Sequence, residues 1–196
     1  MNNLKTICVF CGANSGNRPI YADVAVVLGQ ELAQRQMRLV YGGGSVGLMG
    51  EVARSARDHG CPVIGIIPEH LTTKELMGDP IGDLIVVKTM HERKAKMAEL
   101  TDAFIAIPGG FGTMDELFEA ITWGQIGLHA KPIGLLNVAG YFDLLIQFID
   151  HCVSEGFIRP YHRQLFLVDE DPSRLLTRLA SHQLPPGLVP DGLERA

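Results

Sequence analysis

Short apolar runs alternate with amphipathic stretches along the whole chain, and this order predicts strands that alternate with helices. Residues 4–11 are mostly apolar, as in a buried strand, whereas apolar side chains in residues 19–35 recur at helical spacing. Further strands are predicted at 38–41, 62–67, 84–88, 103–107, 132–137 and 165–168, and further helices at 46–59, 90–101, 114–127, 141–155 and 172–181. Repeats of strand then helix are typical of a parallel sheet with helices on both faces. Right-handed crossovers then make a doubly wound α/β fold.

The chain has 196 residues, which suits one globular domain. We expect the α/β domain to span residues 1–181. Residues 182–196 contain three prolines and two glycines, and we expect an irregular C-terminal tail there.

The formal net charge is −5, which offers no general electrostatic attraction to DNA, RNA or an anionic membrane. An anionic small ligand would therefore need a local basic site. No apolar run approaches the roughly 20 residues of a membrane span. With no signal peptide apparent, we expect a cytoplasmic protein with reduced thiols.

Cys8 and Cys11 form a C-x-x-C pair, a spacing found in redox and zinc sites. Within one extended strand, however, positions three apart point to opposite faces and lie about 10 Å from each other. We therefore expect buried thiols, with neither a disulfide nor a metal site.

Three loops that leave predicted strands are rich in glycine: residues 12–17, 42–47 and 108–113. Ligands of doubly wound sheets bind at this edge, and a helix N-terminus behind a glycine turn suits phosphate. One such loop is explained equally well by a tight turn, but three on one edge favour a nucleotide-like ligand. The candidate contacts in these loops are Ser15, Gly43, Gly44, Gly109, Gly110, Phe111, Gly112 and Thr113.

The second loop also matches G-x-G-x-x-G through Gly42, Gly44 and Gly47, with Glu69 at the distance of a ribose-binding carboxylate. The match is weak because the loop follows the second predicted strand and not the first. An NAD(P)-dependent oxidoreductase remains an alternative on this basis.

The third loop ends in Thr113-Met114-Asp115-Glu116, which predicts a capping box in which Thr113 caps a helix and Glu116 reaches back. Glu116 would then also lie one turn behind the phosphate loop, where a carboxylate could act as an acid or base or hold a ribose hydroxyl. Both roles stay open.

A second possible capping box, Thr89 with Glu92, opens a helix that carries Arg93, Lys94 and Lys96. Cations in the first helical turn oppose the helix dipole, so this cluster indicates an anionic partner. A solvated surface run is the alternative, and we expect His91 to cap or pack.

Two of these segments together resemble a known family. Residues 108–116 read P-G-G-F-G-T-M-D-E, and residues 90–94 read M-H-E-R-K. With Cys8-Val9-Phe10-Cys11-Gly12 and Tyr41-Gly42-Gly43-Gly44, they are similar to the LOG (LONELY GUY) family. The likeness runs from about residue 5 to residue 170.

The resemblance implies a Rossmann-like fold, a homodimer and no cofactor. It also implies hydrolysis of N6-substituted adenosine 5′-monophosphates, or of AMP, to free base and ribose 5-phosphate. The catalytic pair of the family falls on Arg93 and Glu116. Its other substrate contacts fall on Glu75, Lys94, Thr122 and residues 110–116, which include Met114 and Asp115.

The expected chemistry fits these residues. Positive charge develops on the ribose as the base leaves, and a carboxylate can stabilise that charge or orient water. We assign this role to Glu116, the positioning of the sugar phosphate to Arg93, and the binding of phosphate to residues 110–113. A non-catalytic nucleotide carrier is a further alternative, and the choice between a cytokinin precursor and AMP stays open.

Overall fold

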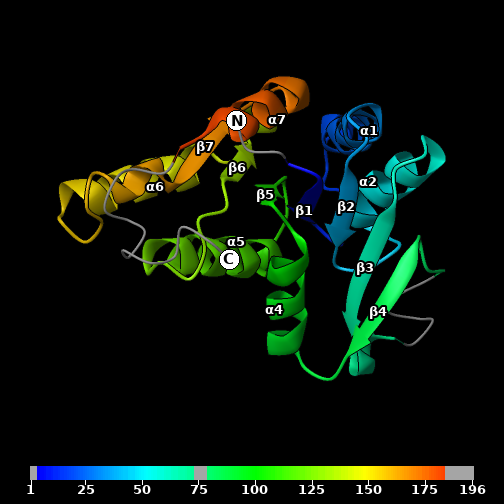
Figure 1. Ribbon diagram of the computed structural model, residues 1–196. Helices are drawn as coiled ribbons and strands as arrows, with labels where there is room; N and C mark the ends of the chain where they lie inside the picture. Colours follow the sequence, from blue (N-terminus) through cyan, green and yellow to red (C-terminus); the bar gives the residue numbers. More distant parts are fainter. Residues whose placement is uncertain (1–3, 73–78, 184–196) are drawn as a thin grey trace.

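A seven-stranded sheet forms the centre of the molecule, which the computed structural model describes for residues 4–72 and 79–183 (Figure 1). Its strands run in the order β4-β3-β2-β1-β5-β6-β7, and every neighbouring pair is parallel. The strands are β1 Thr6–Phe10, β2 Arg38–Tyr41, β3 Val63–Pro68, β4 Asp83–Val87, β5 Ala103–Ala106, β6 Ile133–Leu136 and β7 Phe166–Asp169.

Helices cover both faces of this sheet, which confirms the predicted doubly wound α/β fold. They are α1 Pro19–Gln34, α2 Gly47–Asp58, α4 Met90–Leu100, α5 Phe111–Gln125, α6 Asp143–Ser154 and α7 Pro172–Ser181. Single turns of 3₁₀-helix lie in the connections between elements: η1 Glu69–Leu71 after β3, η2 Val138–Gly140 after β6 and η3 His162–Leu165 before β7. In the described chain, no helix is long and apolar enough to cross a membrane.

Side chains of the central strands alternate between two hydrophobic cores. In β1, Ile7 and Val9 pack with α1, α2 and α7, whereas Cys8 and Phe10 pack with α4, α5 and α6. Figure 1 separates α1 and α7, above the sheet, from α4 and α5 below it. Cys11 belongs to the first core, so the two thiols of the C-x-x-C pair face opposite sides, and both are free.

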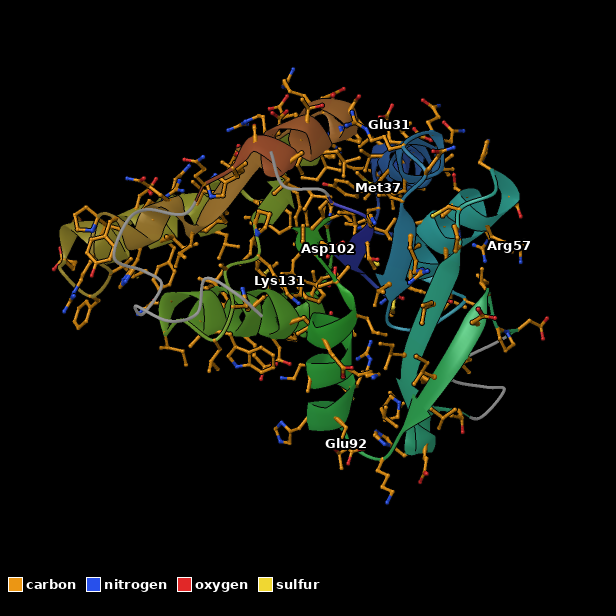
Figure 2. The ribbon with its side chains drawn as sticks, viewed as in Figure 1. Glu31, Met37, Arg57, Glu92, Asp102 and Lys131 are labelled. Atoms are coloured by element: carbon orange, nitrogen blue, oxygen red, sulfur yellow. The ribbon has the colours of Figure 1, made fainter. Side chains whose placement is uncertain are left out.

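The strand order reverses beside β1. Strands β2 to β4 extend from one side of it and β5 to β7 from the other, so the loops that leave β1 and β5 diverge at the same point. Gly12 N donates to Pro108 O across this point at 3.0 Å. At the opposite edge Asp102 (Figure 2) accepts from Lys5 N and Thr6 N and fixes the start of β1. The β1–β5 switch point is therefore where a ligand is expected.

One of the two predicted capping boxes is wrong. Helix α5 begins at Phe111, three residues earlier than expected, with Gly110 as N-cap and no side-chain cap. Thr113 therefore lies inside the first turn, where its side chain packs under Gly109. The turn can close this tightly because Gly109 has no Cβ: one built there would lie 2.0 Å from Thr113 Oγ1.

The other predicted capping box is present at the start of α4 in a variant form, in which Glu92 reaches back to the residue before the N-cap Thr89. Thr89 Oγ1 accepts from Glu92 N at 3.1 Å, and Glu92 Oε2 accepts from Lys88 N at 2.8 Å. Glu92 is seen in Figure 2 at the turn from β4 into α4. His91 is exposed and does not cap the helix, contrary to expectation.

Candidate active site

A cavity of about 460 Å³ opens at the β1–β5 switch point. Its walls come from the exits of β1 and β5, the starts of α2 and α5, and single side chains of α1, α4 and the segment after β6. The lining residues are Cys11, Gly12, Ala13, Asn14, Ser15, Gly16, Tyr21, Leu48, Met49, Arg93, Pro108, Gly109, Gly110, Phe111, Gly112, Thr113, Glu116 and Tyr141.

Arg93 extends from the first turn of α4 to the cavity and is only 8% exposed. Its guanidinium is held on three sides. Nε donates to Ile66 O at 3.0 Å, Nη2 donates to Gly42 O at 3.3 Å, and Nη1 lies 3.2 Å from Glu116 Oε1. This planar group thus joins the ends of β2 and β3 to α5, a set of bonds that a lysine could not make.

Glu116, in the second turn of α5, is the carboxylate of this pair and is also 8% exposed. Burial raises the pKa of Glu116 above its ordinary value, while the neighbouring Arg93 charge acts in the opposite direction. Burial also raises the pKa of the Cys11 thiol in the cavity wall, and the Glu116 carboxylate adds to that effect. Cys11 therefore stays a neutral thiol beside the Arg93–Glu116 pair.

The turn at residues 108–113 forms the wall next to this pair. Met114 N donates to Gly110 O, which closes the first turn of α5. The N–H groups of residues 111–113 therefore have no carbonyl acceptor within the helix. A Cβ at Gly110 or Gly112 would meet nothing within 4 Å, so the backbone is openly accessible there. Free N–H groups at the positive end of a helix bind anions such as phosphate. The side chain of Phe111 is 97% exposed at the rim.

Two of the three cations of the α4 cluster, Arg93 and Lys94, are not solvated surface charges, whereas Lys96 pairs with Glu99 of the same helix at the surface. Arg93 pairs with Glu116, and the Lys94 ammonium lies 3.1 Å from Asp115 and 2.7 Å from Glu119. The anionic partner that the sequence indicated for the first turn of α4 is thus supplied in part by carboxylates of α5.

Several residues predicted from the sequence meet at the cavity: Ser15, Arg93, Gly109, Gly110, Phe111, Gly112, Thr113 and Glu116. Others lie off its wall. Lys94 and Asp115 face each other outside it, Thr122 is exposed two turns further along α5, and Met114 packs into the core. Gly43 and Gly44 lie in the loop after β2 and are not among the residues that line the cavity, although the carbonyl of the preceding Gly42 binds Arg93. Glu75 lies outside the described residues.

Sequence reasoning did not identify Tyr21, Leu48, Met49 and Tyr141 as cavity residues. Tyr21 carries only the helical spacing of α1, and Leu48 and Met49 follow the second glycine loop without a distinguishing pattern. Tyr141 lies just beyond a strand exit, which is the one signal that could have identified it.

Comparisons with known proteins agree with this geometry. Residues 49–179 match the family model described as "Possible lysine decarboxylase". The cytokinin riboside 5′-monophosphate phosphoribohydrolase LOG5 of Arabidopsis thaliana is 49% identical over 182 residues, which are 93% of this chain and 80% of the relative. Its paralogue LOG3, with the same description, is 50% identical over 181 residues, 92% of this chain and 84% of the relative.

Among solved structures, the molybdenum cofactor carrier protein of Chlamydomonas reinhardtii superposes with a TM-score of 0.68. The match covers 91% of this chain and 99% of the carrier protein at 23% sequence identity. A likeness at this identity shows a shared fold and carries no information on ligand or activity.

Proposed function

This chain belongs to the LOG family of cytokinin riboside 5′-monophosphate phosphoribohydrolases, and we propose that its cavity hydrolyses the N-glycosidic bond of a nucleoside 5′-monophosphate. The single observation that carries the assignment to this cavity is the buried Arg93–Glu116 pair at 3.2 Å, beside the open N-terminus of α5.

The turn at residues 109–113 would take the 5′-phosphate, since it combines accessible backbone with the positive end of α5. The ribose would then lie over Glu116, one turn into the helix. This placement gives the phosphate a positioning role, because it holds the reacting carbon next to the carboxylate.

Glu116 would act as a carboxylate. As the C1′–N bond breaks, its electron pair leaves with the base, and positive charge develops on the sugar. The ionised Glu116 stabilises that charge and orients the water whose oxygen bonds to C1′. The water loses a proton and the departing base gains one, so the products are free base and ribose 5-phosphate.

Arg93 favours the ionised form of the Glu116 carboxyl group. A buried carboxyl group tends to stay protonated, and the adjacent guanidinium opposes that tendency. Since Arg93 is also bonded to the Ile66 and Gly42 carbonyls, its charge stays in place while substrate enters and leaves.

Two alternatives are less compatible with this cavity. A pyridoxal-dependent decarboxylase needs a Schiff-base lysine, and none of the described residues lining the cavity is a lysine. A dinucleotide enzyme would use Gly42, Gly44 and Glu69, yet the Gly42 carbonyl binds Arg93, and Glu69 is exposed in η1.

The test is release of free base from AMP and from isopentenyladenosine monophosphate, measured by chromatography for the wild type and for Glu116→Gln. The variant keeps the size of the side chain and removes its charge, and we expect its kcat to fall at least about 100-fold because carboxylate catalysis contributes this much or more. Undiminished turnover by the variant would remove Glu116 from the mechanism. Binding of AMP without any turnover by the wild type would instead favour a nucleotide carrier.

We further infer a homodimer that forms through the outer face of α5 and the segment after it. Phe118, Ile126 and Leu128 expose 39%, 58% and 63% of their surface there, although they are large apolar residues. Thr122, which the family resemblance assigns to substrate, lies on the same helix face as Phe118. A second copy at this face would cover the apolar side chains and bring Thr122 near the protomer boundary. The four free cysteines are consistent with a cytoplasmic location.

A further inference from the structure

The segment that follows β6 brings an aromatic side chain to the cavity that the mechanism above does not use. Tyr141 lies just after η2, lines the cavity, and donates from its hydroxyl to Gly109 O at 2.5 Å. Its ring is in edge-to-face contact with Tyr21, at 5.6 Å between centroids, and with Phe142, at 5.0 Å.

The segment that carries Tyr141 is itself well anchored. Asn137 Nδ2 donates to Asp143 Oδ1 at 2.7 Å, and Phe142 N donates to Asn137 Oδ1 at 2.7 Å. Phe142 is fully buried next to Tyr141. The Tyr141 hydroxyl is therefore a fixed donor in the cavity wall.

The Gly109 carbonyl that Tyr141 binds belongs to the peptide between two glycines, Gly109 and Gly110. Such a peptide rotates easily because neither neighbour has a Cβ that restricts it. The preceding carbonyl, Pro108 O, is held by Gly12 N at 3.0 Å. Tyr141 holds the next one, so the Pro108 and Gly109 carbonyl oxygens are both bonded to groups outside α5.

The direction of a carbonyl matters here because the turn would bind an anion. In a trans peptide the N–H points opposite to the C=O, and the described chain has no cis peptide bond. With its oxygen on Tyr141, the Gly109–Gly110 peptide directs the Gly110 N–H away from Tyr141. If this peptide turned over, a partially negative oxygen would replace a donor at the phosphate position.

We propose that Tyr141 is a positioning residue for the substrate's 5′-phosphate: its hydroxyl holds the Gly109 carbonyl and thereby keeps the Gly110 N–H available to the anion. This inference rests on the proposed function, since it assumes that the phosphate lies at residues 109–113. It predicts that loss of the Tyr141 hydroxyl weakens the binding of ligands that carry the phosphate and leaves the reaction of ligands without it unchanged.

The test is Tyr141→Phe, which removes the hydroxyl and keeps both ring contacts. A neutral hydrogen bond is worth about 1 kcal/mol, so we expect the Kd for ribose 5-phosphate, titrated by calorimetry, to rise about fivefold. The KM for AMP should rise by a similar factor with little change in kcat, and kcat/KM for adenosine should stay the same.

The matched control is Tyr161→Phe. The Tyr161 hydroxyl likewise makes a side-chain hydrogen bond, which it accepts from Arg159 at 2.7 Å, but it lies outside the cavity wall. A general loss of packing would lower the melting temperature and affect AMP and adenosine alike. Equal losses for both substrates in Tyr141→Phe, or a Kd for ribose 5-phosphate no different from that of Tyr161→Phe, would overturn the inference. A wild type that binds no ribose 5-phosphate and cleaves neither AMP nor isopentenyladenosine monophosphate would refute the proposed function as well, and it is recognised without the variant.

Discussion

Replacing Arg93 by methionine tests whether one guanidinium holds the cavity together. The substitution keeps much of the side-chain length and removes three donors at once, from Ile66 O, Gly42 O and Glu116. Removing one partner of a buried ion pair costs about 3–5 kcal/mol, and each buried carbonyl left unpaired adds about 1 kcal/mol. Water entering from the open cavity recovers part of this loss. We therefore expect a fall of about 4 kcal/mol in the free energy of unfolding, or about 10 °C in Tm.

The pH dependence of this loss has a definite sign. Without Arg93, the pKa of the buried Glu116 should rise further above the value it has in the unfolded chain. The folded state then holds the Glu116 proton more tightly than the unfolded state does. The variant should therefore lose stability as pH rises through the range between these two pKa values, and its deficit relative to the wild type should be smaller at pH 5 than at pH 8.

Trp123, the only tryptophan in the chain, lies in α5 and can report unfolding by urea through its fluorescence. Arg57→Met is the matched control, because Arg57 (Figure 2) forms only an exposed pair with Asp58 and should cost less than about 1 kcal/mol. Adding Glu116→Gln to Arg93→Met should restore about 2 kcal/mol by removing the unpaired charge. The reasoning is refuted if Arg93→Met is as stable as Arg57→Met, or if its deficit grows as the pH is lowered.

Two further predictions concern the turn and the interface. Gly109→Ala should lower Tm by about 4 °C or more and abolish base release, because its Cβ would lie 2.0 Å from Thr113 Oγ1. The Cβ of Gly110→Ala meets nothing within 4 Å, so this variant should change Tm by only about 2 °C. Thermal melts that give both variants the same Tm would contradict this account of the turn. Light scattering should show a dimer for the wild type and a monomer for Phe118→Asp combined with Leu128→Asp, and a monomeric wild type would rule out the α5 interface.

The fold could be predicted from the sequence because the relevant forces act over a few residues. The apolar spacing of α1 and the short apolar runs of β1, β2 and β3 are local patterns, and each of these elements lies within two residues of its predicted bounds. The predicted start of α5 is three residues too late because threonine is a preferred N-cap residue, and Thr113 is therefore expected to precede the helix. Its actual role depends on a close approach to Gly109, which composition does not reveal.

Part of the candidate site was also visible in the sequence. Glycines after strands predict where a backbone can approach an anion, and the family resemblance singled out Arg93 and Glu116. The contacts of Lys94 could not be predicted in the same way. Its ion pairs with Asp115 and Glu119 span 21 and 25 residues and depend on α4 packing beside α5.

The order of strands and helices and the glycine turn at residues 108–113 could be predicted from the sequence, because periodicity and turn chemistry are properties of neighbouring residues, whereas the resemblance to the family identified the charged pair. Only the tertiary structure decided what surrounds them. Arg93 binds carbonyls 27 and 51 residues away, and Tyr141 binds one 32 residues away. These contacts depend on the strand order, in which β5 pairs with β1 and not with β4. The strand order depends on how all the strands and helices pack together, so no single segment of the sequence specifies it.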